Sequence, residues 1–130
     1  MIALDTNLLV RLIVRDDPEQ VGRAAALVRG SACWVPRTVL LETEWVVRAV
    51  YGYTPAQTVE ALERLVSMEN VTLEDHATAA LAVEWHRRGL DFADALHLAA
   101  SRGQEAFATF DGPLRRAAAR LAGPPLTLEP

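Results

Sequence analysis

Residues 2–14 read IALDTNLLVRLIV, a short apolar run followed by an aspartate and then by a helical pattern. The run Ile2-Ala3-Leu4 is typical of a buried strand, and the stretch from Asn7 to Val14 predicts a helix that begins just after Asp5. The same order, a strand followed by a helix, recurs along the chain. This alternation predicts an α/β fold with a mostly parallel sheet.

Helix-start signals and glycines mark the other expected elements. Asp17-Pro18 and Thr54-Pro55 each place a capping residue before a proline at the first helical position. Glycines follow the ends of several helical patterns. The expected helices after the first cover 18–29, 36–51, 55–68, 75–88, 91–101 and 112–121. The expected strands after the first cover 33–35, 71–73, 106–110 and 126–128, which makes five strands in all.

Length and composition narrow the class of protein. A chain of 130 residues with 51% hydrophobic residues fits a single domain over residues 1–130. No apolar run is long enough for a membrane span, no signal peptide opens the chain, and Cys33 is the only cysteine, so we expect a cytoplasmic protein without disulfides. The chain has no lysine, which excludes lysine-dependent chemistry, and its net charge of −4 is not that of a general nucleic-acid binder.

Four acidic residues fall where a parallel sheet would bring them together. Asp5 and Asp111 end predicted strands, Asp94 lies in the first turn of a predicted helix, and Glu42 lies about two turns into the helix that Pro36 opens. Ligand sites of open α/β sheets form at the carboxyl ends of the strands. Converging carboxylates need a cation, and Mg²⁺ or Mn²⁺ prefers oxygen ligands. Hydrolysis of phosphodiester bonds is the chemistry that such a site favours.

Each acid also has a structural interpretation. Asp5 would serve as an N-cap and Asp111 as a turn residue. Asp91 fits an N-cap better than a ligand, which leaves Asp94 on the helix face that carries His97. Glu42 is the most informative, because no basic residue lies near it on its own helix.

Two further assignments concern neighbours of Glu42. Glu44 has Arg48 four residues later, which predicts an ion pair on the solvent side of the helix. The tryptophans, Trp45 among them, are expected in the core rather than as platforms for stacking RNA bases.

Four stretches that contain these acids resemble, in order, the motifs of PIN-domain ribonucleases, specifically the VapC-type toxins of bacterial toxin–antitoxin pairs. Glu42 and Asp94 stand at the acidic positions of the second and third motifs. The resemblance extends from residue 2 to about residue 121. The stretches are LDTNLLVR (4–11), LETEWVV (41–47), DFADALH (91–97) and ATFD (108–111).

The resemblance implies a three-layer α/β/α sandwich around the five-stranded sheet and RNA cleavage that depends on Mg²⁺ or Mn²⁺. It also implies inhibition by a small cognate antitoxin, and a homodimer. The residues expected to hold the metal and carry catalysis are Asp5, Glu42, Asp94 and Asp111. The supporting residues would be Thr6 or Asn7, which would position a water or a ligand, and Thr109, which would hold Asp111 by a hydrogen bond.

Two other classes of protein share part of this pattern. A haloacid dehalogenase-like phosphatase also has an aspartate after its first strand, but it needs a second aspartate where this chain has Asn7, and it normally uses a lysine. A non-catalytic module of the PIN fold would bind RNA or an antitoxin without cutting. Cleavage that disappears with EDTA separates the enzyme from the module.

Overall fold

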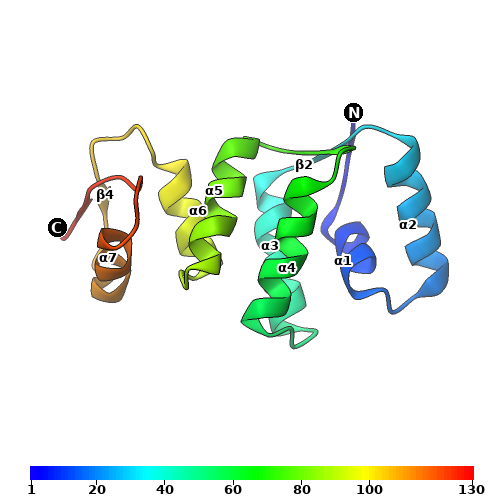
Figure 1. The fold of residues 1–130 in the computed structure, drawn as a ribbon, viewed down its shortest axis with the longest axis horizontal. Coiled ribbons are helices and arrows are strands. Elements are labelled where there is room, and N and C mark those ends of the chain that lie inside the picture. The colour runs from blue at the N-terminus through cyan, green and yellow to red at the C-terminus, as the bar shows by residue number, and fades with distance from the viewer.

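A computed structural model describes residues 1–130 and contains both kinds of expected element in the expected order (Figure 1). The strands are β1 (Ile2–Ala3), β2 (Cys33–Val35), β3 (Val71–Leu73), β4 (Phe107–Ala108) and β5 (Thr127–Leu128). The helices are α1 (Thr6–Val14), α2 (Pro18–Gly30), α3 (Arg37–Ala49), α4 (Pro55–Ser67), α5 (His76–Arg87), α6 (Phe92–Ala100) and α7 (Gly112–Ala119).

The N-terminal part of the chain builds a parallel sheet of three strands in the order β1-β2-β3. Ile2 pairs with Cys33, and Cys33 pairs in turn with Val71. A helix follows each strand, so α1, α3 and α5 all begin at the carboxyl edge of this sheet. That edge is where the sequence placed Asp5.

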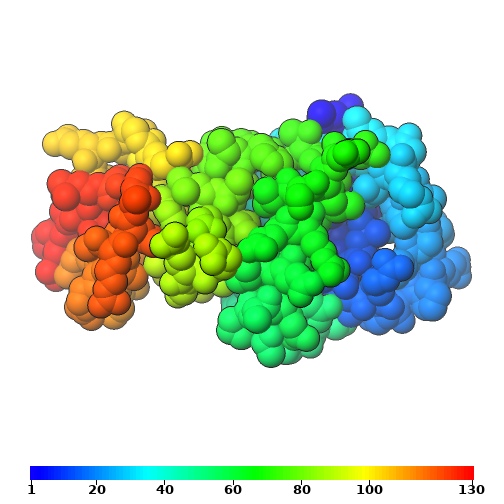
Figure 2. All heavy atoms as spheres, in the orientation of Figure 1, coloured from blue at the N-terminus to red at the C-terminus, as the bar shows by residue number.

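The prediction of one five-stranded sheet was wrong. β4 and β5 pair with each other in parallel and form a second sheet, separate from β1-β2-β3. Together with α7 they make a C-terminal unit that lies beyond α5 and α6 at one end of the molecule (Figures 1 and 2). Two-residue strands such as these carry too few side chains to specify which sheet edge they join.

The core follows from the apolar faces of the helices. Its largest fully buried side chains include Phe92 and Leu98 of α6, Leu9 of α1 and Leu40 of α3. Leu114 of α7 belongs to the same apolar cluster, so the C-terminal unit is fixed to the rest through its helix. Helix α6, which carries Asp94, is therefore one of the most firmly packed elements.

The helix-start signals act as predicted. Asp17 accepts a hydrogen bond from the Gln20 amide at the start of α2, and Thr54 and Gln57 form a reciprocal capping box at the start of α4. Each bond satisfies an amide that has no partner inside the helix. None of the seven helices combines the length and the apolar character that a membrane crossing requires.

Candidate functional site

Asp5 stands at the N-cap position of α1 without acting as a cap. Its backbone is extended there, but its side chain accepts no hydrogen bond from the first turn of the helix. The aspartates at the starts of α2, α6 and α7 all do accept such a bond. The carboxylate of Asp5 is exposed and has no structural partner, so the capping interpretation does not account for it.

Glu42 is joined to the start of α1 by a side-chain hydrogen bond. The buried hydroxyl of Thr6 donates to Oε1 of Glu42, across 36 positions of sequence. The bond fixes the Glu42 carboxylate on the same side of the molecule as Asp5. Thr6, expected to position a water or a ligand, thus orients an acidic side chain in this structure.

Helices α1 and α3 form the walls of a depression of about 290 Å³ around these side chains. Asn7 also faces it. The lining residues are Asp5, Thr6, Asn7, Val10, Arg11, Glu42, Val46 and Tyr51. Two carboxylates, a hydroxyl and an amide thus meet in one concave surface next to the carboxyl end of β1.

Arg11 is a member of this depression whose role the sequence did not reveal. Its guanidinium donates to Gln20 (2.6 Å), Asp16 (3.0 Å) and the hydroxyl of Tyr51 (3.2 Å). The hydrogen bond to Tyr51, followed by the charge of Asp16, raises the pKa of Arg11. The spacing from Asn7 to Arg11, one helical turn, was the signal that could have identified it.

Asp94 lies in a second acidic group, at the starts of α6 and α7. Partial burial raises the pKa of Asp94, and the charges of Asp91 and Asp111 raise it further, while His97 acts in the opposite direction. Asp91 accepts a hydrogen bond from the Asp94 amide (3.2 Å), which confirms its expected role as the cap of α6.

Asp111 is engaged as a cap in this structure. Its carboxylate accepts a hydrogen bond from the Leu114 amide (3.0 Å) at the start of α7. Thr109 accepts a bond from the backbone amide of Asp111 (3.0 Å) and so orders the turn rather than the carboxylate. The second carboxylate oxygen of Asp111 is left for a ligand.

The four predicted acids therefore occupy two places in one chain. Asp5 and Glu42 share the depression between α1 and α3, and Asp94 and Asp111 lie next to Asp91 on the C-terminal side. No group of three or more histidine, cysteine or acidic side chains surrounds a single point. The donors are all oxygens, which fits Mg²⁺ or Mn²⁺ in chemistry, but each place by itself offers fewer protein ligands than the four predicted.

Two assignments near Glu42 were wrong. Glu44 is 2% exposed rather than on the solvent side, and Arg48 pairs with it at 2.8 Å. Trp45 is 53% exposed rather than in the core. The cause is the phase of α3, which buries Leu40, Thr43, Glu44 and Val47. Glu42 and Trp45, three residues apart, therefore share the exposed side of the helix.

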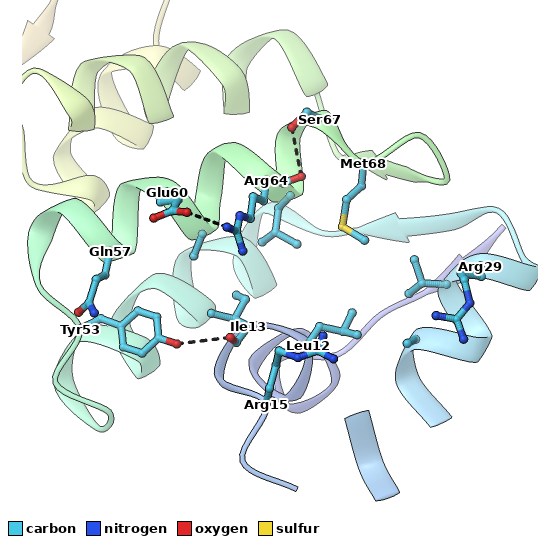
Figure 3. A pocket seen from close by; sticks show the side chains of 14 residues that line it. Leu12, Ile13, Arg15, Arg29, Tyr53, Gln57, Glu60, Arg64, Ser67 and Met68 are labelled. Atoms are coloured by element: carbon cyan, nitrogen blue, oxygen red, sulfur yellow. Dashed lines mark hydrogen bonds and ion pairs between the residues drawn. The ribbon is translucent and has the colours of Figure 1, made fainter. Parts of the chain in front are cut away.

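A larger hollow of about 740 Å³ lies between α1, α2 and α4 (Figure 3). Eight of its 14 lining residues are hydrophobic, and Tyr53 closes one side by donating to the carbonyl of Ile13 (3.3 Å). Arg64 is paired with Glu60 (2.7 Å), whereas Arg15 and Arg29 form no ion pair. Glu60, the one acidic residue in its lining, is therefore already paired.

One family of known proteins matches the chain. The family model described as "PIN domain" matches residues 2–120, which is nearly the whole chain and includes all four predicted acids. The search of curated proteins gave no match.

Proposed function

Because the chain belongs to the PIN domain family, we propose that it is a metal-dependent endoribonuclease that acts in the cytoplasm as the toxin of a toxin–antitoxin pair. PIN domains are commonly nucleases and often ribonucleases. The free carboxylate of Asp5 carries the proposal. It caps no helix and lies in the same depression as Glu42, so it is available to a ligand.

Four residues would hold the metal, namely Asp5, Glu42, Asp94 and Asp111. Their oxygens are the donors that Mg²⁺ and Mn²⁺ prefer. When bound, such an ion lowers the pKa of water and offsets charge on a phosphodiester. The proposal requires the two acidic places to be brought together.

The other side chains of the depression would bind and orient the RNA. The Thr6 hydroxyl holds the Glu42 carboxylate in one orientation through their hydrogen bond. Arg11 offers a fixed positive charge to a phosphate, and Asn7 a neutral donor and acceptor. The exposed ring of Trp45, on the same side of α3 as Glu42, is suited to stacking with an unpaired base.

The test of this activity compares two aspartates at helix starts. Asp5→Asn should abolish cleavage of single-stranded RNA while the circular dichroism spectrum stays native. Asp17→Asn is the matched control, because asparagine caps nearly as well and Asp17 lies outside the depression. EDTA should stop the wild type, and Mg²⁺ or Mn²⁺ should restore it. Full activity of Asp5→Asn, or of the wild type in excess EDTA, would refute the mechanism.

A small antitoxin is proposed as the partner that controls this activity. An inserted arginine or lysine would take the place of the metal charge beside Asp5 and Glu42. The apolar hollow of Figure 3 shares helix α1 with the depression, and it would bury apolar side chains of the same partner. Arg15 and Arg29, which form no ion pair, favour acidic residues on that partner.

Co-expression tests the partner. The product of a neighbouring small gene should suppress toxicity and copurify with the chain, and a double Arg15→Glu, Arg29→Glu variant should lose that partner while it keeps its RNA cleavage. If the chain expressed alone is harmless and retains no such protein, the toxin assignment fails.

One observation favours the alternative of a non-catalytic module of the same fold. In a single chain, no three acidic side chains surround one point. Such a module would bind RNA equally well with EDTA and with Mg²⁺ and would leave it intact. Fluorescence anisotropy with a labelled RNA, followed by a gel of the same sample, distinguishes the module from the enzyme.

A further inference from the structure

Each of the two sheets ends in a strand whose outer edge has no partner. Ile2 and Leu4 donate their amides to β2, so Ala3 between them directs its own amide and carbonyl away from β2. The same alternation holds in β4, where Phe107 and Thr109 donate to the β5 side and Ala108 faces outward. Both open edges are parallel-sheet edges of equal length.

Large apolar side chains are exposed mainly beside β1 and in the C-terminal unit. Seven large hydrophobic residues are exposed in the whole chain, and five lie at the N-terminal end of the chain, in or next to β1, or in the C-terminal unit. A two-stranded sheet is only marginally stable without further cover, and a monomer rarely leaves such surface to water. The five residues are Met1, Ile2, Phe110, Leu126 and Leu128.

The two edges do not reach each other within one chain. β1 lies near the N-terminus toward one end of the elongated molecule, and β4 lies at the other end, beyond α5 and α6 (Figure 1). The C-terminal unit is held there because Leu114 and Ala118 of α7 are buried in the main core. Pairing within the chain would pull both side chains out of that core.

We propose that β4 of one copy pairs in parallel with β1 of a second copy, so that each protomer completes the sheet of the other. Two elongated molecules side by side in opposite directions offer both pairs of edges at once, which gives a closed dimer. The order then becomes β3-β2-β1 followed by β4-β5 of the partner subunit, a continuous parallel sheet of five strands.

The dimer unites the two acidic places. Asp5 follows β1 by two residues and Asp111 follows β4 by three, and neighbouring parallel strands lie about 4.8 Å apart with their carboxyl ends together. Asp5 and Glu42 of one copy thus come next to Asp94 and Asp111 of the partner subunit. This consequence rests on the proposed nuclease function, whereas the strand pairing itself does not.

Sedimentation of the full chain tests the pairing without any assay of activity. The wild type should sediment as a dimer, with EDTA as well as with Mg²⁺. Ala3→Pro and Ala108→Pro each remove the outward amide but no bond inside a sheet, so each should sediment as a monomer with a native circular dichroism spectrum. Ala3→Val and Ala108→Val keep the amide and should remain dimers. A monomeric wild type, or proline variants that stay dimeric, overturns the proposal.

Mixing two inactive variants tests the shared site. Asp5→Asn and Asp111→Asn, unfolded together and refolded, form mixed dimers in which one of the two sites is intact. Cleavage should recover to about a quarter of the wild-type rate, as random pairing of protomers in a closed dimer requires. A mixture that stays inactive while the wild type cleaves overturns the shared site. A dimeric wild type without cleavage rejects the proposed function but leaves the strand pairing in place.

Discussion

Replacing Asp94 by asparagine should stabilise the metal-free protein. Asp94 lies in the first turn of α6, where burial and the charges of Asp91 and Asp111 raise its pKa. The folded state therefore binds a proton at Asp94 more tightly than the unfolded chain does. Asparagine keeps the shape of the side chain and removes the charge that the folded state disfavours.

The raised pKa of Asp94 determines the direction in which its replacement changes the free energy of unfolding. Because the folded-state pKa of Asp94 is raised, the folded state loses stability as pH rises from the ordinary value of 3.8 through the folded-state pKa. The loss is complete at neutral pH. Asp94 is half-buried. Solvent therefore screens part of the repulsion, and the gain in Asp94→Asn should be about 0.5 kcal/mol. For a chain of this size, that gain raises Tm by about 2 °C.

Thermal melts followed by circular dichroism check this expectation, with EDTA present, at pH 3 and at pH 7. Asp94→Asn should melt above the wild type at pH 7, and the difference should vanish at pH 3, where the carboxyl is protonated in both states. Asp17→Asn, at the N-cap of α2, provides the control. Saturating Mg²⁺ should stabilise the wild type more than Asp94→Asn, since the ion binds only the folded site. A lower Tm for Asp94→Asn at pH 7, or a difference that is the same at both pH values, would refute the reasoning.

Three further predictions concern stability. Arg48→Met leaves the Glu44 carboxylate buried without its counterion and should lower the free energy of unfolding by about 3 kcal/mol. Adding Glu44→Gln should recover part of this loss, and urea denaturation of the single and double variants measures both effects. Phe92→Ala removes a fully buried ring from α6 and should cost about 4 kcal/mol, seen as a lower urea midpoint with an unchanged slope. Thr54→Ala loses the capping box with Gln57 and should lower the free energy of unfolding by about 1 kcal/mol, whereas Thr54→Ser should match the wild type in the same thermal melt.

Local signals in the sequence were sufficient for the elements and for the placement of the acids along them. Asp17-Pro18 and Thr54-Pro55 start α2 and α4, because capping and a fixed proline φ act within one turn. Asp5 was placed at the end of β1 for a similar reason, since the change from apolar strand to helix occurs within a few residues. The family match over residues 2–120 agrees with the resemblance drawn from four short motifs.

The side of α3 that faces the core was not determined by its own sequence. If the buried face of α3 were displaced by one residue, Trp45 would be in the core and Glu44 on the surface. The sequence of α3 is compatible with a helix in both cases. Burial of the Glu44 carboxylate is possible because Arg48 forms an ion pair with it. Trp45 is exposed because packing against α1 and α6 determines which face of α3 is buried.

The order of strands and helices, and the positions of Asp5 and Asp111 after the carboxyl ends of β1 and β4, follow from local sequence. The grouping of the strands into sheets depends on contacts between distant parts of the chain. Strand pairing is a contact between distant segments, and β4, two residues long, has no side-chain pattern that selects one edge over another. The position of β4 and β5 depends instead on the burial of Leu114 and Ala118, which holds the C-terminal unit beside α5 and α6 and leaves the outer edge of β1 unpaired.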